Sequence, residues 1–176
     1  MGKRIVVRPY VAPCGELLLG SYGDDMCLCD WRASSRHVRN LEKLRSALGG
    51  DIEEGDSEVL RLAAGQLDEY FAGRRRSFNL PYIVVGTRFQ AMVWAELDTI
   101  AYGQTRSYAG VALALGSPGG ARAVAQAVGA NRLSIIVPCH RVVGKDQALT
   151  GYAGGIAAKK TLLLLEESSA FVAKMA

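Results

Sequence analysis

The stretch from Ile135 to Val143 constrains this chain most, because a proline interrupts an apolar run and Cys139, His140 and an arginine follow at once. The isoleucines and valines on either side predict buried strand. Pro138 has no N–H to donate to a neighbouring strand and its φ angle is fixed, so it predicts a turn. Cys139 and His140 are therefore expected at a bend between two buried segments, which is a rigid position for a reactive group.

A cysteine beside a histidine suits nucleophilic catalysis by sulfur. A free thiol has a pKa of about 8.5, so only a few per cent is ionised at neutral pH unless neighbouring groups help. The imidazole of His140 can accept the proton, directly or through a water molecule, and Arg141 adds positive charge nearby. The alternative is an inert core cysteine, which is usual in apolar runs, and neighbouring residues of a strand point to opposite faces.

Two short helices precede this stretch and are typical of a helix-turn-helix. Ser107 caps the first, over 108–115, and Pro118 stands at the tolerated first position of the second, over about 117–131. The second helix has mostly small side chains apart from Arg122, so it lacks the long polar residues that read base edges in the major groove. Such a helix suits close approach to the minor groove without sequence reading, with an arginine to wedge into the stack. The alternative is a small-residue helix packed against a neighbour.

The run VPCHRVV at 137–143, followed by GYAGG at 151–155, closely resembles the active-site signature of the O6-alkylguanine-DNA alkyltransferases. These suicide DNA-repair proteins are also called methylated-DNA–protein-cysteine methyltransferases. The resemblance extends from about Thr87 to Glu166, nearly half of the chain. It implies direct damage reversal, in which Cys139 takes a methyl or larger alkyl group from O6 of guanine, or O4 of thymine, in double-stranded DNA and the protein is consumed.

The resemblance also assigns roles around Cys139. It implies that His140 is the base that acts through a water molecule, that Glu166 orients His140, and that Asn131 ties the helix-turn-helix to the active-site strand. This is the general arrangement of nucleophile, base and orienting acid. For Glu166 the alternative is plain, since the leucine-rich run at 162–167 can simply end a core helix.

For the DNA, the resemblance implies base flipping, because an O6 atom inside a duplex cannot reach a buried cysteine. Arg122 would fill the gap that the flipped base leaves, with Ala121 and Ala123 beside it at the DNA. The pocket for the base would be lined by Tyr108, Val142, Tyr152 and Ala153.

Three positions depart from the family pattern. Arg132 stands where the family commonly has proline, Gln147 where glycine is usual, and Ala125 where glycine is frequent. None of them is the nucleophile, so the departures concern loop geometry and the width of the base pocket.

Charge is unevenly distributed along the chain, whose net charge is +4. Residues 1–73 carry 9 basic and 12 acidic side chains, whereas residues 74–145 carry 9 basic and 2 acidic ones. A basic middle third is typical of a protein that binds a polyanion such as DNA. The alternative is a merely solvated basic surface.

The predicted fold class is α/β (α+β) with two domains. Residues 1–76 form an N-terminal α/β domain that begins with an antiparallel β-meander, with strands over about 4–8, 16–22 and 26–31. A helix over 35–48, with Val38 among the apolar residues at helical spacing, and an acidic loop over 51–56 follow. A second helix runs from a cap at Asp56 or Ser57 to about Phe71, and a basic linker over 73–77 marks the domain boundary. Residues 77–176 form a mostly helical DNA-binding and alkyl-transfer domain. It opens with a capping box at Thr87–Gln90, whose helix turns Phe89, Val93, Leu97 and Ile100 inward.

Metal and cofactor chemistry are not expected. Cys14, Cys27, Cys29 and His37 are the candidate zinc ligands, but C-x-C with scattered partners is a weak pattern, and small buried hydrophobes are the favoured role for the cysteines. Four cysteines make no disulfide framework in a chain of 176 residues, and no apolar run reaches the roughly 20 residues that span a bilayer. A cytoplasmic monomer is expected, or a nuclear one in a eukaryote.

Three other functions remain possible from the sequence. A lesion-binding protein of the alkyltransferase-like type would lack the cysteine, which is present here as Cys139. A cysteine hydrolase would need an oxyanion hole and would leave the helix-turn-helix unexplained. A sequence-specific regulator would need base-reading side chains and usually dimer symmetry.

Overall fold

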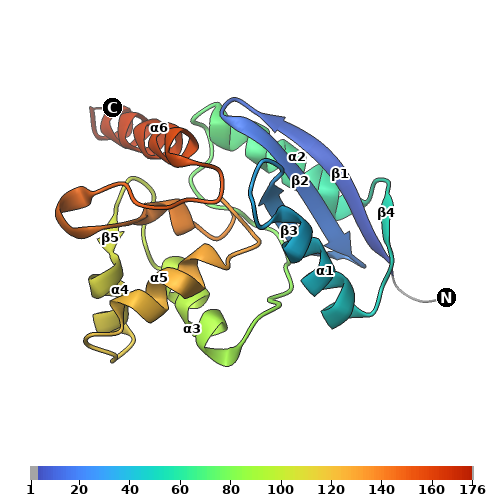
Figure 1. Ribbon diagram of the computed structural model, residues 1–176. Coiled ribbons are helices and arrows are strands. Elements are labelled where there is room, and N and C mark those ends of the chain that lie inside the picture. The colour runs from blue at the N-terminus through green and yellow to red at the C-terminus, as the bar shows by residue number, and fades with distance from the viewer. Residues whose placement is uncertain (1–3, 176) are drawn as a thin grey trace. The chain divides into compact units, whose positions relative to one another are not determined.

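The computed structural model describes residues 4–175, and the chain divides after Val85 into two compact units, which are described separately below (Figure 1). The sequence placed the boundary at a basic linker after residue 76. Residues 77–85 instead belong with the first unit, because the Met26 N–H donates to the carbonyl of Pro81 (2.8 Å) and the Ile83 N–H donates to the carbonyl of Met26 (2.8 Å). Within residues 4–175, no helix combines the length and the apolar character needed to cross a membrane.

The N-terminal unit is built on a four-stranded sheet of order β3-β2-β1-β4. The strands β1 (Ile5–Ala12), β2 (Gly15–Tyr22) and β3 (Asp25–Trp31) form the antiparallel meander that the alternating pattern predicted. The fourth strand, β4 (Ile52–Glu54), pairs parallel with β1 where the sequence indicated only an acidic loop. That prediction was wrong because three residues with two carboxylates carry no strand pattern of their own, and long-range pairing with β1 creates the strand.

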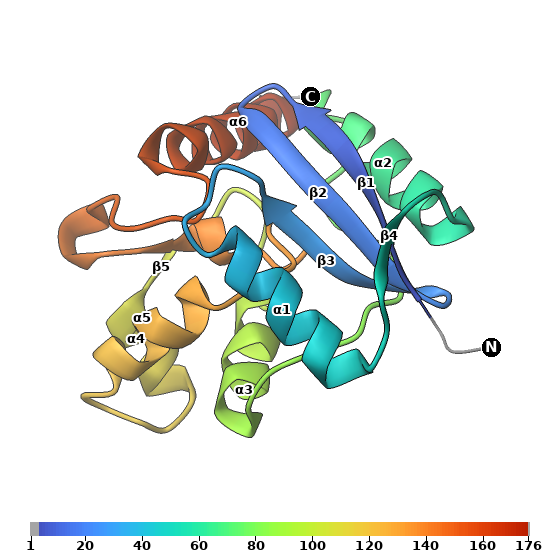
Figure 2. The ribbon, with the colours of Figure 1, turned by 45° about the vertical axis from the view of Figure 1, so that its right-hand side comes forward.

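Two helices cover the sheet, α1 (His37–Leu48) on one face and α2 (Glu58–Phe71) on the other (Figure 2). Of the two caps that the sequence allowed for α2, Asp56 and Ser57, the structure has Ser57, whose hydroxyl accepts from the Leu60 N–H. Leu44 of α1 packs in a core with Ile5, Val7, Leu18, Cys27 and Leu28. The sequence also predicted an inward position for Val38, which is exposed, because the face of α1 that reaches the sheet is centred on Asn40 and Leu44.

Gly20 in β2 allows the close packing of this sheet. It lies opposite Leu28 of β3, and a Cβ atom at Gly20 would lie 2.8 Å from the Leu28 Cβ atom. We expect Gly20→Ala to lower the free energy of unfolding by roughly 1–3 kcal/mol, because neither backbone can move without breaking the ladder. Urea denaturation measures this effect. The control is Gly65→Ala in α2, where nothing lies within 4 Å and alanine should stabilise by up to about 1 kcal/mol; equal behaviour of the two variants would contradict the prediction.

The second unit contains four α-helices in its described part: α3 (Arg88–Leu97), α4 (Tyr108–Ala114), α5 (Ala121–Gly129) and α6 (Ile156–Met175). The capping box at Thr87 and Gln90 and the cap at Ser107 are both present, which confirms these two helix starts. In α3, Val93 and Leu97 are buried as predicted, but Phe89 in the first turn is partly exposed. The helices α4 and α5 pack together as the predicted helix-turn-helix pair.

The helix α5 starts at Ala121, later than Pro118, where the sequence predicted it. The reason lies in the two glycines between these residues. Gly119 has a φ angle of 86°, which is outside the helical region, and a chain in that conformation cannot continue a helix from Pro118. As a result Ala121, Arg122 and Ala123 form the first turn of α5.

The segment before Pro138 is a tight turn and not the strand that its isoleucines predicted. Ile135 has a φ angle of 71°, and a single bridge joins Ser134 to Val137. After the proline, Cys139–Arg141 form a short 3-10 helix, η1, and Val142–Val143 form β6, which pairs parallel with β5 (Arg106–Ser107). Of the two predicted strands, only the second is present, over two residues.

Candidate active site

The helix η1 fixes Cys139, His140 and Arg141 in the interior of the second unit. Pro138 caps it, the Cys139 N–H donates to the Val137 carbonyl (2.8 Å), and the Arg141 N–H donates to the Pro138 carbonyl (3.0 Å). The side chains of all three η1 residues are buried. The bend that was expected at Pro138 is therefore a turn of 3-10 helix. In a strand, neighbouring side chains such as those of Cys139 and His140 would point to opposite faces, and the helical turn avoids this.

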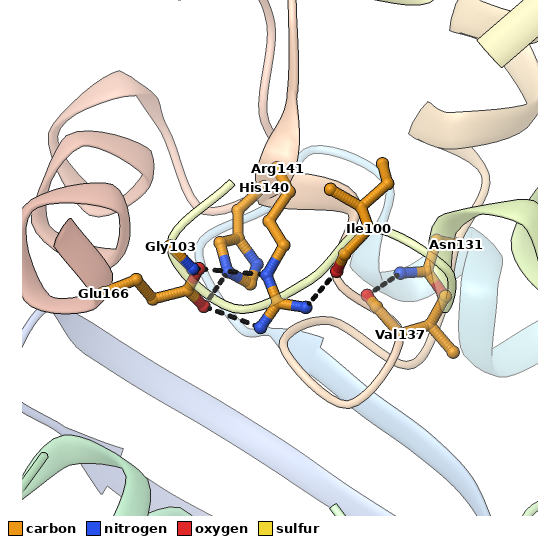
Figure 3. A network of polar contacts seen from close by, with 7 residues as sticks. All are labelled: Ile100, Gly103, Asn131, Val137, His140, Arg141 and Glu166. Carbon is orange, nitrogen blue, oxygen red and sulfur yellow. Dashed lines mark hydrogen bonds and ion pairs between the residues drawn. The ribbon is translucent and has the colours of Figure 1, made fainter. Parts of the chain in front are cut away.

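Glu166 of α6 accepts four hydrogen bonds and joins His140 to Arg141 (Figure 3). His140 Nε2 lies 2.7 Å from Glu166 Oε1, and Arg141 donates from Nε to Oε2 (2.9 Å) and from Nη2 to Oε1 (3.0 Å). The Gly103 N–H donates to Oε2 at 3.3 Å. A carboxylate with four donors around it is held in one orientation, and so is the imidazole that it contacts.

The charge states follow from burial and from these donors. Burial alone would raise the pKa of Glu166, but the hydrogen bonds and positive charge of His140 and Arg141 lower it to about 2. Burial lowers the pKa of His140, against the opposing effect of Glu166. A neutral imidazole that donates from Nε2 to an ionised Glu166 has Nδ1 as an acceptor, and Nδ1 has no hydrogen-bond partner among the residues whose side chains the structure describes.

The sequence suggested that Arg141 adds positive charge near Cys139. In the structure, the guanidinium of Arg141 is instead engaged by other groups. Besides its two bonds to Glu166, it donates from Nη1 to the Ile100 carbonyl (2.7 Å), and it lies over the ring of Tyr102. Its charge is therefore compensated by Glu166, and its geometry makes it a support for that carboxylate.

Asn131 follows directly after α5 and its C-terminal cap Ala130 and reaches the turn before Cys139. Its Nδ2 donates to the Val137 carbonyl (3.0 Å), and its Oδ1 accepts from the Leu133 N–H (3.0 Å). The side chain thus connects the end of α5 to the backbone that leads into η1, which is the kind of link that the resemblance implies for this residue (Figure 3).

Burial raises the pKa of the Cys139 thiol, and the side chains of Asn131 and Ser134 and the positive charge of Lys159 act to lower it. Ser134 and Lys159 did not emerge from the sequence. A serine in an apolar run carries no signal, and a lysine in a helix usually extends into solvent, as the exposed neighbour Lys160 does. Lys159, by contrast, is fully buried.

The residues predicted to meet DNA and the base lie outside this buried network. Arg122 and Ala123 are exposed and Ala121 is half-buried, all in the first turn of α5. The residues predicted to line the base pocket differ in burial. Tyr108, the first residue of α4, is half-buried and accepts a long hydrogen bond from Thr150 (3.4 Å). Val142 is buried, and Tyr152 and Ala153, which precede α6, are half-buried.

The cysteines of the first unit have other surroundings. No group of three or more histidine, cysteine or acidic residues within the described chain is placed to hold a metal ion. His37 instead pairs through Nδ1 with the buried carboxylate of Asp30 (2.9 Å), which Asn40 also contacts. Burial raises the pKa of Cys27 to about 12, so this thiol stays protonated, as a small core residue does.

Comparison with known proteins covers both units. The family models "6-O-methylguanine DNA methyltransferase, ribonuclease-like domain" and "6-O-methylguanine DNA methyltransferase, DNA binding domain" match residues 5–82 and 88–168. The constitutive methylated-DNA–protein-cysteine methyltransferase of Bacillus subtilis is 43% identical over 86% of this chain and 88% of its own length. The Methanosarcina barkeri protein of the same name is 46% identical over 90% and 94%.

A solved structure agrees with these relatives. The crystal structure of Mycobacterium tuberculosis OGT in complex with DNA matches with a TM-score of 0.80 and 39% identity, over 93% of this chain and 94% of that one. The α/β fold with its helix-turn-helix is therefore the fold of these proteins. Fold, active-site sequence and similarity over nearly the full length agree, and the chain belongs to the family of the methylated-DNA–protein-cysteine methyltransferases.

Proposed function

We propose that this protein repairs alkylated double-stranded DNA by direct reversal, moving a methyl or larger alkyl group from O6 of guanine, or O4 of thymine, to the sulfur of Cys139. The observation that carries the proposal is the buried contact of 2.7 Å between His140 and Glu166, with Cys139 directly before His140 on the rigid helix η1. This arrangement gives a buried nucleophile a base of fixed orientation.

The transfer is a single displacement. The Cys139 thiol gives its proton to Nδ1 of His140 through a water molecule, and a lone pair of the sulfur attacks the alkyl carbon. The bond from that carbon to O6 breaks, and its electron pair stays on the base, which takes up a proton and becomes guanine. The thioether on Cys139 has no easy leaving route, so each molecule reacts once. Glu166 remains ionised and keeps the imidazole in the acceptor tautomer.

DNA binding is assigned to the helix-turn-helix of α4 and α5. The first turn of α5 exposes Arg122 and the small side chain of Ala123, a surface that fits closely into a minor groove and can place one cation in the base stack. Tyr108, Val142, Tyr152 and Ala153 line the pocket for the flipped base. The protein acts as a monomer, in the cytoplasm or, in a eukaryote, in the nucleus.

The test is mass spectrometry of the intact protein after incubation with a duplex carrying one O6-methylguanine. A gain of one methyl group per molecule, located on the Cys139 peptide and absent in Cys139→Ala, supports the proposal. Tight binding to the lesion without a gain would favour a lesion-binding protein of the alkyltransferase-like type. If the protein neither gained a methyl group nor bound the lesion, the proposal would be refuted.

Arg122 offers a test of base flipping. We expect Arg122→Ala to slow methyl transfer from duplex DNA by at least about tenfold, because filling the gap in the stack repays part of a flipping cost of a few kcal/mol. Transfer from a single-stranded oligonucleotide, where little stacking is lost, should slow much less. Single-turnover rates on both substrates measure the ratio. Lys160→Ala, which removes an exposed cation from α6, is the control, and an equal loss on both substrates would contradict the flipping role.

A further inference from the structure

The elements that carry Tyr108 are short, although this residue has to meet the flipped base at a defined place. Tyr108 begins α4, a helix of seven residues, and follows directly after β5, a strand of two. The strand β5 pairs with β6 at two positions, Arg106 opposite Val142 and Ser107 opposite Val143. A two-stranded ribbon is marginally stable by itself, so the backbone pairing needs a further support.

The side chain of Arg106 supplies that support by connecting β5 to the end of α3. Its Nη1 donates to Glu96 Oε1 and lies 3.4 Å from the Thr99 hydroxyl. The Thr99 hydroxyl donates to the Glu96 carbonyl (2.7 Å) and lies 3.2 Å from the same carboxylate oxygen, Oε1. The side chains of Arg106 and Glu96 are 31% and 21% exposed. Three side chains therefore hold one another in a single, largely covered arrangement.

The aliphatic stem of Arg106 also lies against the first turn of α4. A Cβ atom at Gly110 would lie 3.0 Å from Cγ of Arg106 and 3.6 Å from its Cδ. Gly110 is also the residue whose N–H donates to the capping hydroxyl of Ser107 (3.0 Å). Glycine within a helix costs about 1 kcal/mol relative to alanine, and close contact with the arginine stem explains why glycine stands here.

We propose that Arg106 is a positioning residue, which fixes the first turn of α4, and with it Tyr108, relative to the strand that follows η1. The backbone of Arg106 pairs with Val142, the first residue after η1, while its side chain holds the end of α3 and supports α4. The inference deepens the proposed function and rests on it, since the place of Tyr108 matters only when a base enters the pocket.

The contribution of Arg106 is one of geometry, because Glu96 compensates its charge. A similar ion pair joins Arg75 to Glu69 in the first unit, with 2.7 Å between Nε and Oε2 and side chains that are 25% and 46% exposed. Such partly exposed pairs contribute little to stability in general. What distinguishes Arg106 is its place between two elements of the proposed site, and Arg75 is therefore the matched control.

The test is single-turnover methyl transfer from a duplex with one O6-methylguanine over a range of DNA concentrations. We expect Arg106→Ala to lower the maximal rate at least about tenfold, because a misplacement of about 1 Å can cost about a hundredfold. The DNA concentration that gives half the maximal rate should change by less than about twofold, since the first turn of α5 keeps its residues. Arg106→Lys, which keeps a stem and a charge, should recover most of the rate, and Arg75→Ala should react like the wild type.

Two double variants show whether Arg106 acts through Tyr108. In a Tyr108→Ala background, Arg106→Ala should slow transfer by less than about twofold more, because residues that act as one unit are not additive. Gly110→Ala should slow transfer by itself, since the added methyl group displaces the arginine stem, and should lose most of this effect in an Arg106→Ala background.

The outcomes separate this inference from the proposed function. A wild-type maximal rate in folded Arg106→Ala, or an equal slowing with and without Tyr108, would overturn the positioning role. If Arg106→Ala does not fold, Glu96→Gln, which removes the charge that holds the guanidinium, has to show the same loss of maximal rate or the inference is overturned. Failure of the wild type to accept a methyl group from DNA would instead refute the proposed function.

Discussion

Replacing Glu166 with glutamine is expected to slow methyl transfer to Cys139 by about 10²–10⁴-fold, the range that a correctly held general base contributes. Each oxygen of Glu166 accepts two bonds, Oε1 from His140 and Arg141 and Oε2 from Arg141 and Gly103. A glutamine has one acceptor oxygen, and its NH₂ group would face donors on whichever side it lies. Either His140 or Arg141 therefore loses its acceptor, and the tautomer with Nδ1 free to accept a proton is no longer enforced.

Single-turnover transfer from a duplex with one O6-methylguanine measures the rate. The control is Glu167→Gln, the exposed neighbour on α6, which should react like the wild type. The acid stability of the protein should change as well. The pKa of Glu166 is lowered to about 2 in the folded protein, so its stabilisation is complete above its unfolded pKa of about 4.3 and is lost as the pH falls towards 2. A Glu166→Gln variant with normal rate and unchanged acid unfolding would show that the carboxylate has neither role.

The parts of this fold that could be predicted from the sequence are those with local causes. Ser57, Thr87 and Ser107 cap their helices because a side-chain oxygen lies within three residues of the N–H that it accepts from. The meander followed from alternating hydrophobicity and tight turns. The start of α5 was misplaced by a local signal, since Pro118 suits a first helical position but the glycines after it do not continue the helix.

The features that escaped prediction depend on residues far apart in the chain. The strand β4 exists only through pairing with β1, and β6 only through pairing with β5. For the candidate site, Cys139 and His140 were indicated by their own chemistry, whereas Glu166 and Asn131 were indicated only through the family resemblance. The burial of Lys159 and the bonding of Arg141 to Glu166 arise when α6 packs on η1, and no local pattern encodes that packing.

Replacing Arg141 with methionine should lower the free energy of unfolding by about 3–5 kcal/mol, the usual effect of removing one partner of a buried ion pair. Without the guanidinium, Glu166 would stay buried with only His140 and Gly103 as donors, and the Ile100 carbonyl would lose its donor as well. The side chains of Arg141 and Glu166 are both at least nine-tenths buried, so water cannot replace the guanidinium without opening the structure. Urea denaturation followed by circular dichroism measures the change, with Arg88→Met, at an exposed arginine of the same unit, as the control.

The double variant Glu166→Gln with Arg141→Met separates the interaction of the pair from the contribution of each residue. Methionine removes the donors that oppose the glutamine NH₂ group, and the glutamine oxygen can then accept from His140. We expect the loss in free energy of unfolding of the double variant to be smaller than the sum of the two single-variant losses by more than about 1 kcal/mol. Such non-additivity is usual for residues within one network. Its transfer rate should stay low, because a neutral amide cannot stabilise the imidazolium that forms at His140. Additive stability losses would mean that Arg141 supports the fold through its contact with Ile100 and not through Glu166.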